Sequence, residues 1–209
     1  MSRRLLVVPA LVLALALSAC GLSRTNSYSY ITGDGRVQAI PASKQGDPVE
    51  MTGTTLDGQP FDLASTRGKV TVLNVWGAWC PSCLEEAAEV QAAHRQLGDG
   101  VAFVGIDIRD TSQDNALAYQ HNYSLTYPSI WSPDSKVLLA LNDFVSARTI
   151  PATIILDPTG KPVTIIRGAI PSTLTLVEAV QDVQKASEPS PPPSAKARKA
   201  VTSPKAKKP

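Results

Sequence analysis

The hydrophobic residues between 44 and 184 fall into short apolar runs separated by longer, partly polar segments. Residues 70–76 are rich in β-branched and aromatic side chains, and residues 101–107 form a near-continuous apolar run. Neither run alternates with polar residues, as a strand facing water would. Both are typical of strands buried on both faces of a sheet.

Helical patterns follow these runs. Pro81 stands where a helix can begin without losing a needed N–H, and Gly98 is a typical end signal, so a helix is predicted over residues 81–97. Further helices are predicted over 111–122, 135–142 (short) and 172–184.

Two stretches predict hairpins. Residues 52–63 alternate polar and apolar side chains around Asp57-Gly58, and residues 152–167 carry two apolar runs around Asp157–Gly160. Residues 128–131 predict a short strand or loop. The order of elements describes an α/β domain with a mixed central sheet flanked by helices.

The ends of the 209-residue chain differ from this domain in composition. Residues 20–43, whose early part is rich in Ser, Tyr and Gly, are predicted to be a flexible tether, and the domain is placed at 44–184. Residues 185–209 consist mainly of Pro, Ala, Ser and Lys, and are predicted to be a disordered tail. The tail carries seven basic residues against one acidic residue, whereas the whole chain is only +2. The basicity therefore belongs to the tail, and nucleic acid is disfavoured as a partner.

The N-terminus predicts export. Arg3-Arg4 precede the apolar run 5–17, which is too short to span a bilayer stably. Residues 17–20, Leu-Ser-Ala-Cys, are similar to a bacterial lipobox, so residues 1–19 are predicted to be a signal peptide and Cys20 a lipid anchor. An ordinary signal peptide cut after Ala19 is the alternative. Either way the domain would face an oxidising compartment, where disulfides persist.

The candidate chemistry is a Cys-x-x-Cys pair. Cys80 and Cys83 follow the strand at 70–76 and flank the start of the helix at Pro81. The N-terminus of a helix stabilises a thiolate and typically lowers a Cys pKa from about 8.5 to about 3.5–7.5. A zinc site needs four ligands, and the other cysteine and the two histidines are isolated, so a redox pair is favoured.

With these residues placed, the chain resembles the TlpA/ResA-type thioredoxin-fold oxidoreductases over nearly all of 44–184. The resemblance rests on Leu56-Asp57-Gly58, Arg67-Gly68-Lys69, residues 74–83, Val104-Gly105-Ile106-Asp107, and Ile150-Pro151-Ala152-Thr153 with Asp157 and Gly160. It implies a thioredoxin fold with an added N-terminal β-hairpin. It also implies membrane-tethered thiol–disulfide oxidoreductase activity.

Carried over residue by residue, Cys80 matches the exposed nucleophile and Cys83 the buried resolving thiol. Pro151 matches the cis-proline beside the dithiol, and Ile150 precedes it. Trp76 and Trp79 match residues that pack around the pair, although core filling explains Trp76 equally well.

Asn74 departs from the thioredoxin pattern, because thioredoxins proper have a buried Asp six residues before the first cysteine. Asn cannot exchange a proton in the relevant pH range. Glu86 falls where ResA-like members place a carboxylate near the active site, and it is the candidate replacement. The alternative is a solvated residue beside Glu85 and Glu89.

The resemblance favours reduction of exported disulfides, including those of apocytochrome c. We expect no cofactor or metal and a monomer that works with exported protein thiols and a membrane redox partner on the extracytoplasmic face. Three alternatives remain. A disulfide-forming oxidase has the same residues; a thiol peroxidase would have a Thr in the region of Gly77; a lipoprotein could bind Cu(I) through the two cysteines.

Overall fold

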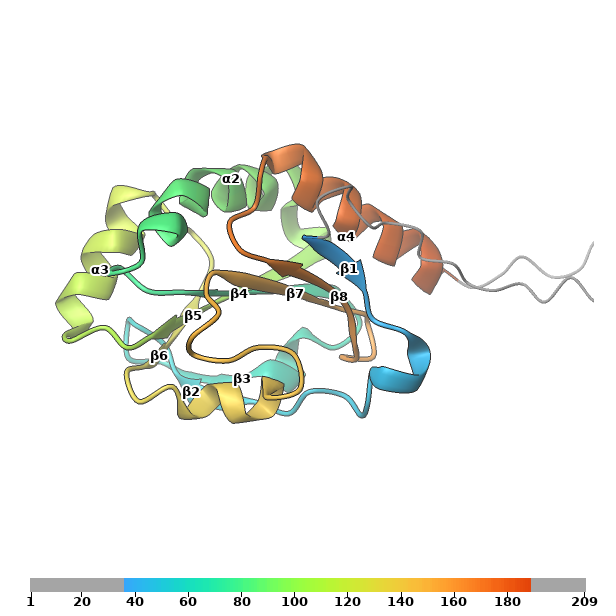
Figure 1. The fold of residues 1–209 in the computed structure, drawn as a ribbon, viewed down its shortest axis with the longest axis horizontal. Coiled ribbons are helices and arrows are strands. Elements are labelled where there is room, and N and C mark those ends of the chain that lie inside the picture. The colour runs from blue at the N-terminus through green and yellow to red at the C-terminus, as the bar shows by residue number, and fades with distance from the viewer. Residues whose placement is uncertain (1–35, 189–209) are drawn as a thin grey trace, which may run out of the picture.

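Three α-helices cover one face of a six-stranded sheet (Figure 1). The computed structural model describes residues 36–188. The strands are β1 (Val37–Ala39), β2 (Thr52–Thr54), β3 (Pro60–Asp62), β4 (Val70–Trp76), β5 (Val101–Ile108), β6 (Ser129–Ser132), β7 (Ala152–Leu156) and β8 (Pro162–Arg167). The α-helices are α2 (Pro81–Leu97), α3 (Gln113–Asn122) and α4 (Thr173–Ser187).

The sheet is mixed, as the sequence predicts. Its order is β1-β8-β7-β4-β5-β6. Strands β4, β5 and β6 run parallel, whereas β7 is antiparallel to both β4 and β8, and β1 is antiparallel to β8. All seven residues of the central strand β4 are buried, which confirms the interpretation of its apolar run.

The alternation of side chains along β4 divides the core into two layers. Val70, Val72 and Trp76 pack with the α-helices, while Leu73 and Val75 pack on the opposite face. That second face is covered by the β2–β3 hairpin and a 3-10 helix over Lys136–Leu141 (Figure 1). Asn74 shares its side of β4 with Val72 and Trp76, so it points towards α2.

The predicted start of the domain at residue 44 is too late. Strand β1 lies inside the stretch assigned to the tether, and it pairs with the outer edge of β8. Val37 is fully buried, and Ile40 N donates to Val163 O at 2.8 Å. A strand of three residues carries no periodic signal, and it forms because β8 offers free backbone groups along that edge.

The C-terminal end of the domain also extends beyond its prediction. Helix α4 continues to Ser187, three residues past the predicted end at 184. The signal peptide, Cys20 and the first part of the tether lie outside the described residues, as does the tail from residue 189. Among residues 36–188, no helix is both long and apolar enough to cross a membrane.

Candidate active site

The two cysteines meet at the N-terminus of α2. Cys80 is the N-cap of the helix, Pro81 is its first residue, and Cys83 lies on the first turn. Cys80 and Cys83 form a disulfide with Cα atoms 5.2 Å apart, and Cys83 N donates to Cys80 Sγ at 3.2 Å. In this oxidised form Cys80 is 3% exposed and Cys83 is fully buried. Both cysteines are therefore buried in this form, and Cys80 is far less exposed than expected.

The loop before Cys80 is pressed against the end of β5. The indole Nε1 of Trp79 donates to Ile108 O at 2.9 Å, and Ala78 N donates to Asp110 Oδ2 at 2.9 Å. A Cβ atom at Gly77 would lie 2.5 Å from the Trp79 Nε1 atom and 2.9 Å from Ile108 O. Gly77 is therefore required for this close approach of backbone and indole.

Glu86 is buried behind the dithiol, one turn after Cys83. Glu86 lies three residues after Cys83 and four before Val90, which places it on the core-facing side of α2. Its side chain is only 1% exposed. Glu86 Oε1 accepts from Asn74 Nδ2 at 2.8 Å, and Oε2 accepts from Ile170 N at 2.8 Å. Burial raises the pKa of Glu86 to about 7, although both hydrogen bonds act in the opposite direction. A solvated role for Glu86 is thus excluded.

Asn74 links this carboxylate to the neighbouring strand. Its amide Nδ2 also donates to Thr153 Oγ1 on β7 at 3.1 Å. Asn74 thus supplies hydrogen bonds without adding a second charge beside Glu86. Asn74, which departs from the thioredoxin pattern, therefore contacts Glu86, the carboxyl group predicted to compensate for it.

A buried aromatic pair, Trp76 and Tyr119, contacts the first turn of α2. The rings of Trp76 and Tyr119 stack with centroids 4.2 Å apart and an interplanar angle of 16°. The Tyr119 hydroxyl donates to Cys83 O at 2.8 Å. Burial raises the pKa of Tyr119, so the hydroxyl stays protonated and can keep donating. Tyr119 carries no signal of this role in the sequence, because only the packing of α3 brings it to the dithiol.

Pro151 lies at the same end of the sheet as the dithiol. The Ile150–Pro151 peptide bond is cis, as the resemblance implies. Ala152, the next residue, pairs with Val75 of β4, and Pro151 O accepts from Gly168 N at 2.9 Å. Ile150 is partly buried and packs against both layers of the core.

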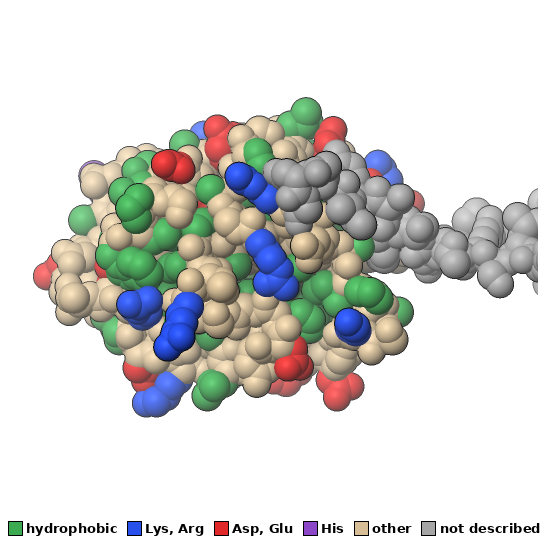
Figure 2. All heavy atoms as spheres, viewed as in Figure 1, with side chains coloured by type: hydrophobic (Ala, Val, Ile, Leu, Met, Phe, Trp, Pro, Cys, Tyr) green, Lys and Arg blue, Asp and Glu red, His purple; other side chains and the backbone are tan. Residues whose placement is uncertain are grey.

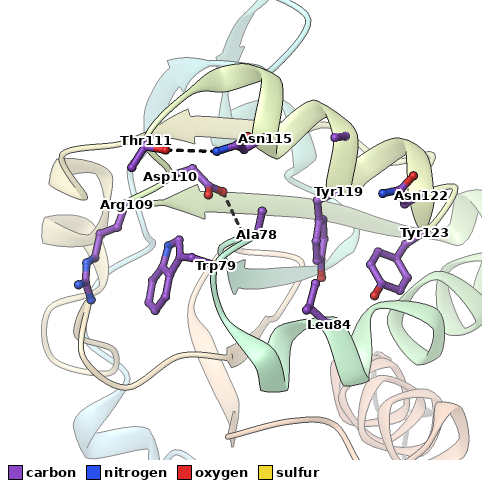
Figure 3. A pocket seen from close by; sticks show the side chains of 11 residues that line it. Ala78, Trp79, Leu84, Arg109, Asp110, Thr111, Asn115, Tyr119, Asn122 and Tyr123 are labelled. Atoms are coloured by element: carbon purple, nitrogen blue, oxygen red, sulfur yellow. Dashed lines mark hydrogen bonds between the residues drawn. The ribbon is translucent and has the colours of Figure 1, made fainter.

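A pocket of about 530 Å³ opens beside the dithiol, between α2 and α3 (Figure 3). Trp79 and Leu84, which flank the Cys80–Cys83 segment in sequence, are 43% and 38% exposed. The Arg109 guanidinium lies 4.6 Å from the centroid of the Trp79 ring, a cation–π contact at the rim. The pocket is thus lined by apolar and uncharged polar groups, with Arg109 and Asp110 as its charged residues.

Charged side chains of both signs lie on the surface of the domain. Figure 2 shows acidic and basic side chains on the same face rather than one continuous basic surface. In the part of the chain that the structure describes, no group of three or more His, Cys, Asp or Glu side chains is arranged to hold a metal ion.

A disulfide at a helix N-terminus, after a buried central strand and beside a cis-proline, defines the class of thioredoxin-like thiol–disulfide proteins. The Redoxin family model matches residues 19–183, so the chain belongs to the Redoxin family.

Individual relatives agree with this class. The chain is 32% identical to the thiol:disulfide interchange protein DsbE of Yersinia pestis, over 69% of this chain and 71% of that protein. It is 29% identical to the thioredoxin-like protein YneN of Bacillus subtilis, over 51% of this chain and 61% of YneN. The chain spans less than two thirds of the length of several curated relatives that it matches, YneN among them.

Solved structures confirm the thioredoxin-like fold. The crystal structure of a DsbF homologue from Corynebacterium diphtheriae matches 73% of this chain and 96% of its own, with a TM-score of 0.65 and 30% identity. The predicted fold class is therefore confirmed.

Proposed function

We propose that this protein is an extracytoplasmic thiol–disulfide oxidoreductase that reduces disulfides of exported proteins, apocytochrome c among the candidates. The observation that carries the proposal is the position of Cys80 as N-cap of α2, bonded to Cys83 and backed by the buried carboxyl group of Glu86.

In the proposed reaction, the reduced protein donates two electrons. The Cys80 thiolate, stabilised by the helix N-terminus, attacks one sulfur of the substrate disulfide and releases the other as a thiolate. Cys83 then attacks the Cys80 sulfur, which reforms the Cys80–Cys83 disulfide and releases the second substrate thiolate. The proton of the Cys83 thiol passes to the Glu86 carboxylate and from there to solvent. A membrane redox partner restores the dithiol.

The pocket between α2 and α3 is the proposed docking site for the polypeptide around the substrate disulfide. Its exposed Trp79 and Leu84 are direct sequence neighbours of Cys80 and Cys83, so a chain bound there would lie close to the dithiol. Polypeptide segments that carry apolar side chains fit such a surface.

The geometry disfavours the peroxidase alternative. A Thr at Gly77 would place its Cβ against the Trp79 indole and the Ile108 carbonyl, so this loop has no room for a side chain there.

The direction of electron flow is tested by the reduction potential of Cys80–Cys83, measured against glutathione. We expect a value near the approximately −270 mV of thioredoxin. A value near the approximately −120 mV of strong oxidants would contradict the reductant and support a disulfide-forming oxidase.

Membrane tethering through Cys20 is tested separately by fractionation. The wild-type protein should partition with membranes, and Cys20→Ala should release it or block its processing. Wild-type protein in the soluble exported fraction would contradict the tether and leave the redox proposal standing.

A further inference from the structure

A second buried carboxyl pair, Asp107 and Asp110, lies at the end of β5 next to the loop that carries Cys80. Asp107 is fully buried and Asp110 nearly so. Asp110 forms one wall of the pocket and accepts the N–H of Ala78, which Figure 3 shows as a dashed line. The reaction proposed above does not use either carboxyl group.

Asp107 has no donor of its own. Among residues 36–188, no N–H or hydroxyl group donates to either of its carboxyl oxygens. Trp76 is its register partner on β4, yet the Trp76 Nε1 atom also remains without an acceptor in that part of the chain. A carboxylate charge buried without a donor is costly, so such a group keeps its proton.

The neighbouring group that can accept this proton in a hydrogen bond is Asp110. Two carboxyl groups can share a hydrogen bond only if one of them is protonated. Burial and the nearby Asp110 carboxyl group raise the pKa of Asp107 to about 9, which favours the protonated form. From α3, the Tyr119 hydroxyl faces the same region and is itself neutral.

We propose that Asp107 is a positioning residue for the dithiol: it donates its proton in a hydrogen bond to Asp110, whose carboxylate fixes the peptide of Ala78. Ala78 lies two residues before Cys80, and the same loop is held by the Trp79–Ile108 hydrogen bond and by the close contact at Gly77. The pair thus holds the loop that leads to Cys80. Because Asp107 stays protonated, the pair carries one negative charge near the Cys80 thiolate instead of two. This inference rests on the proposed dithiol reaction, but its first test does not depend on activity.

The protonation state of Asp107 is measured by the ¹³Cγ signals of labelled aspartate in the full oxidised chain. At pH 7 we expect one aspartate signal in the range of a protonated carboxyl group, and Asp107→Asn should remove it. If every aspartate of the wild-type protein is ionised at pH 7, the proposal is overturned, whether or not the protein reduces disulfides.

The positioning role is measured by the rate at which reduced protein attacks a small disulfide and by the pKa of the Cys80 thiol. Asp107→Val removes the donor, and we expect a roughly tenfold slower attack with a higher thiol pKa, the size expected for one lost hydrogen bond to a charged group. Asp107→Asn retains a neutral donor and should recover most of the rate. Asp114→Asn, on the exposed side of α3, is the matched control for a lost acidic residue.

A purely structural role would lower the stability of Asp107→Val without changing the rate or the thiol pKa of the folded protein. An unchanged rate and thiol pKa in Asp107→Val, or Asp107→Asn as slow as Asp107→Val, would overturn the positioning role. If Asp107→Val does not fold, the labelled aspartate signal and the Asp107→Asn rate still decide. If the wild-type protein shows no thiol–disulfide exchange with any disulfide, the proposed function is overturned instead.

Discussion

At the scale of single residues, the protonation of Glu86 couples the stability of the fold to its chemistry. A buried carboxyl group whose folded pKa of about 7 exceeds its ordinary value of 4.5 binds its proton more tightly in the folded than in the unfolded chain. The contribution of this group to the free energy of unfolding is therefore largest below pH 4.5, and it is lost as the pH rises through 7. Its carboxylate form, which accepts the Cys83 proton, is the less stable one.

Glu86→Gln should remove this dependence. Because the amide stays neutral, the free energy of unfolding should fall less between pH 5 and 8 than in the wild type, by roughly 2–4 kcal/mol. Urea denaturation at several pH values measures it. In the same variant the pH profile of disulfide reduction should lose its inflection near the Glu86 pKa.

Glu85→Gln is the matched control, because Glu85 is an exposed neighbour on the same helix. Identical stability and rate profiles in Glu86→Gln and the wild type would refute the proton-transfer role.

The sequence already contained much of the site at this scale. Cys80, Cys83 and Glu86 could be named because a motif and helical spacing lie within a few consecutive residues. Tyr119 and Asp107 could not be given roles, because these depend on the contacts of Tyr119 with Cys83 and of Asp110 with Ala78, which join segments far apart in sequence. The hydrogen bond from Tyr119 to Cys83 O joins residues that are 36 positions apart.

At the scale of elements, α2 connects the dithiol to the rest of the domain. Its core-facing side carries Cys83 and Glu86, and Glu89 on the next turn accepts from Thr173 N at 2.6 Å at the start of α4. Its exposed residue Leu84 belongs to the pocket shared with α3 (Figure 3). One helix therefore presents the sulfurs, the buried acid and part of the docking surface.

Leu84→Asn tests the docking role of this helix, because it removes the apolar side chain without placing a charge beside the dithiol. We expect KM for a protein disulfide to rise roughly fivefold to tenfold through lost apolar contact, while reduction of a small disulfide keeps its rate. Leu139→Asn is the matched control, because Leu139 is 70% exposed on the 3-10 helix over Lys136–Leu141. Equal losses with both substrates would place Leu84 in the dithiol chemistry rather than in docking.

The hydrophobic pattern predicted these elements closely. The bounds of β4 and α2 agree with the predicted 70–76 and 81–97, because a buried strand and a capped helix each leave a local signal. The arrangement of the helices around the sheet could not be predicted from the hydrophobic pattern. Within residues 36–188, the three α-helices lie on one face. Strands β4, β5 and β6 follow one another in the same direction across the sheet, so right-handed crossovers place α2 and α3 on the same side.

At the scale of the whole molecule, the folded domain begins earlier than composition indicates. Strand β1 covers the edge of β8, and its Val37 and the following Ile40 are buried. No periodic pattern could reveal it, because three residues pair only through the backbone of a strand more than a hundred positions later.

A chain that starts at residue 44 should therefore be less stable than one that starts at residue 36. Loss of the buried Val37 and Ile40 side chains predicts a decrease of roughly 3 kcal/mol or more in the free energy of unfolding, measured by urea denaturation. Equal stability of the two chains would show that β1 contributes nothing to the folded domain.

In the proposed reaction, Cys80 makes the bond to the substrate and Cys83 breaks it. The most direct measurement is the recovery of mixed disulfides from exporting cells that produce Cys83→Ala or Cys80→Ala. Because Cys80 is the N-cap and Cys83 is fully buried, Cys83→Ala should trap exported proteins on Cys80, whereas Cys80→Ala should trap few or none. Equal trapping by both variants, or trapping by neither, would contradict the assignment of Cys80 as the nucleophile.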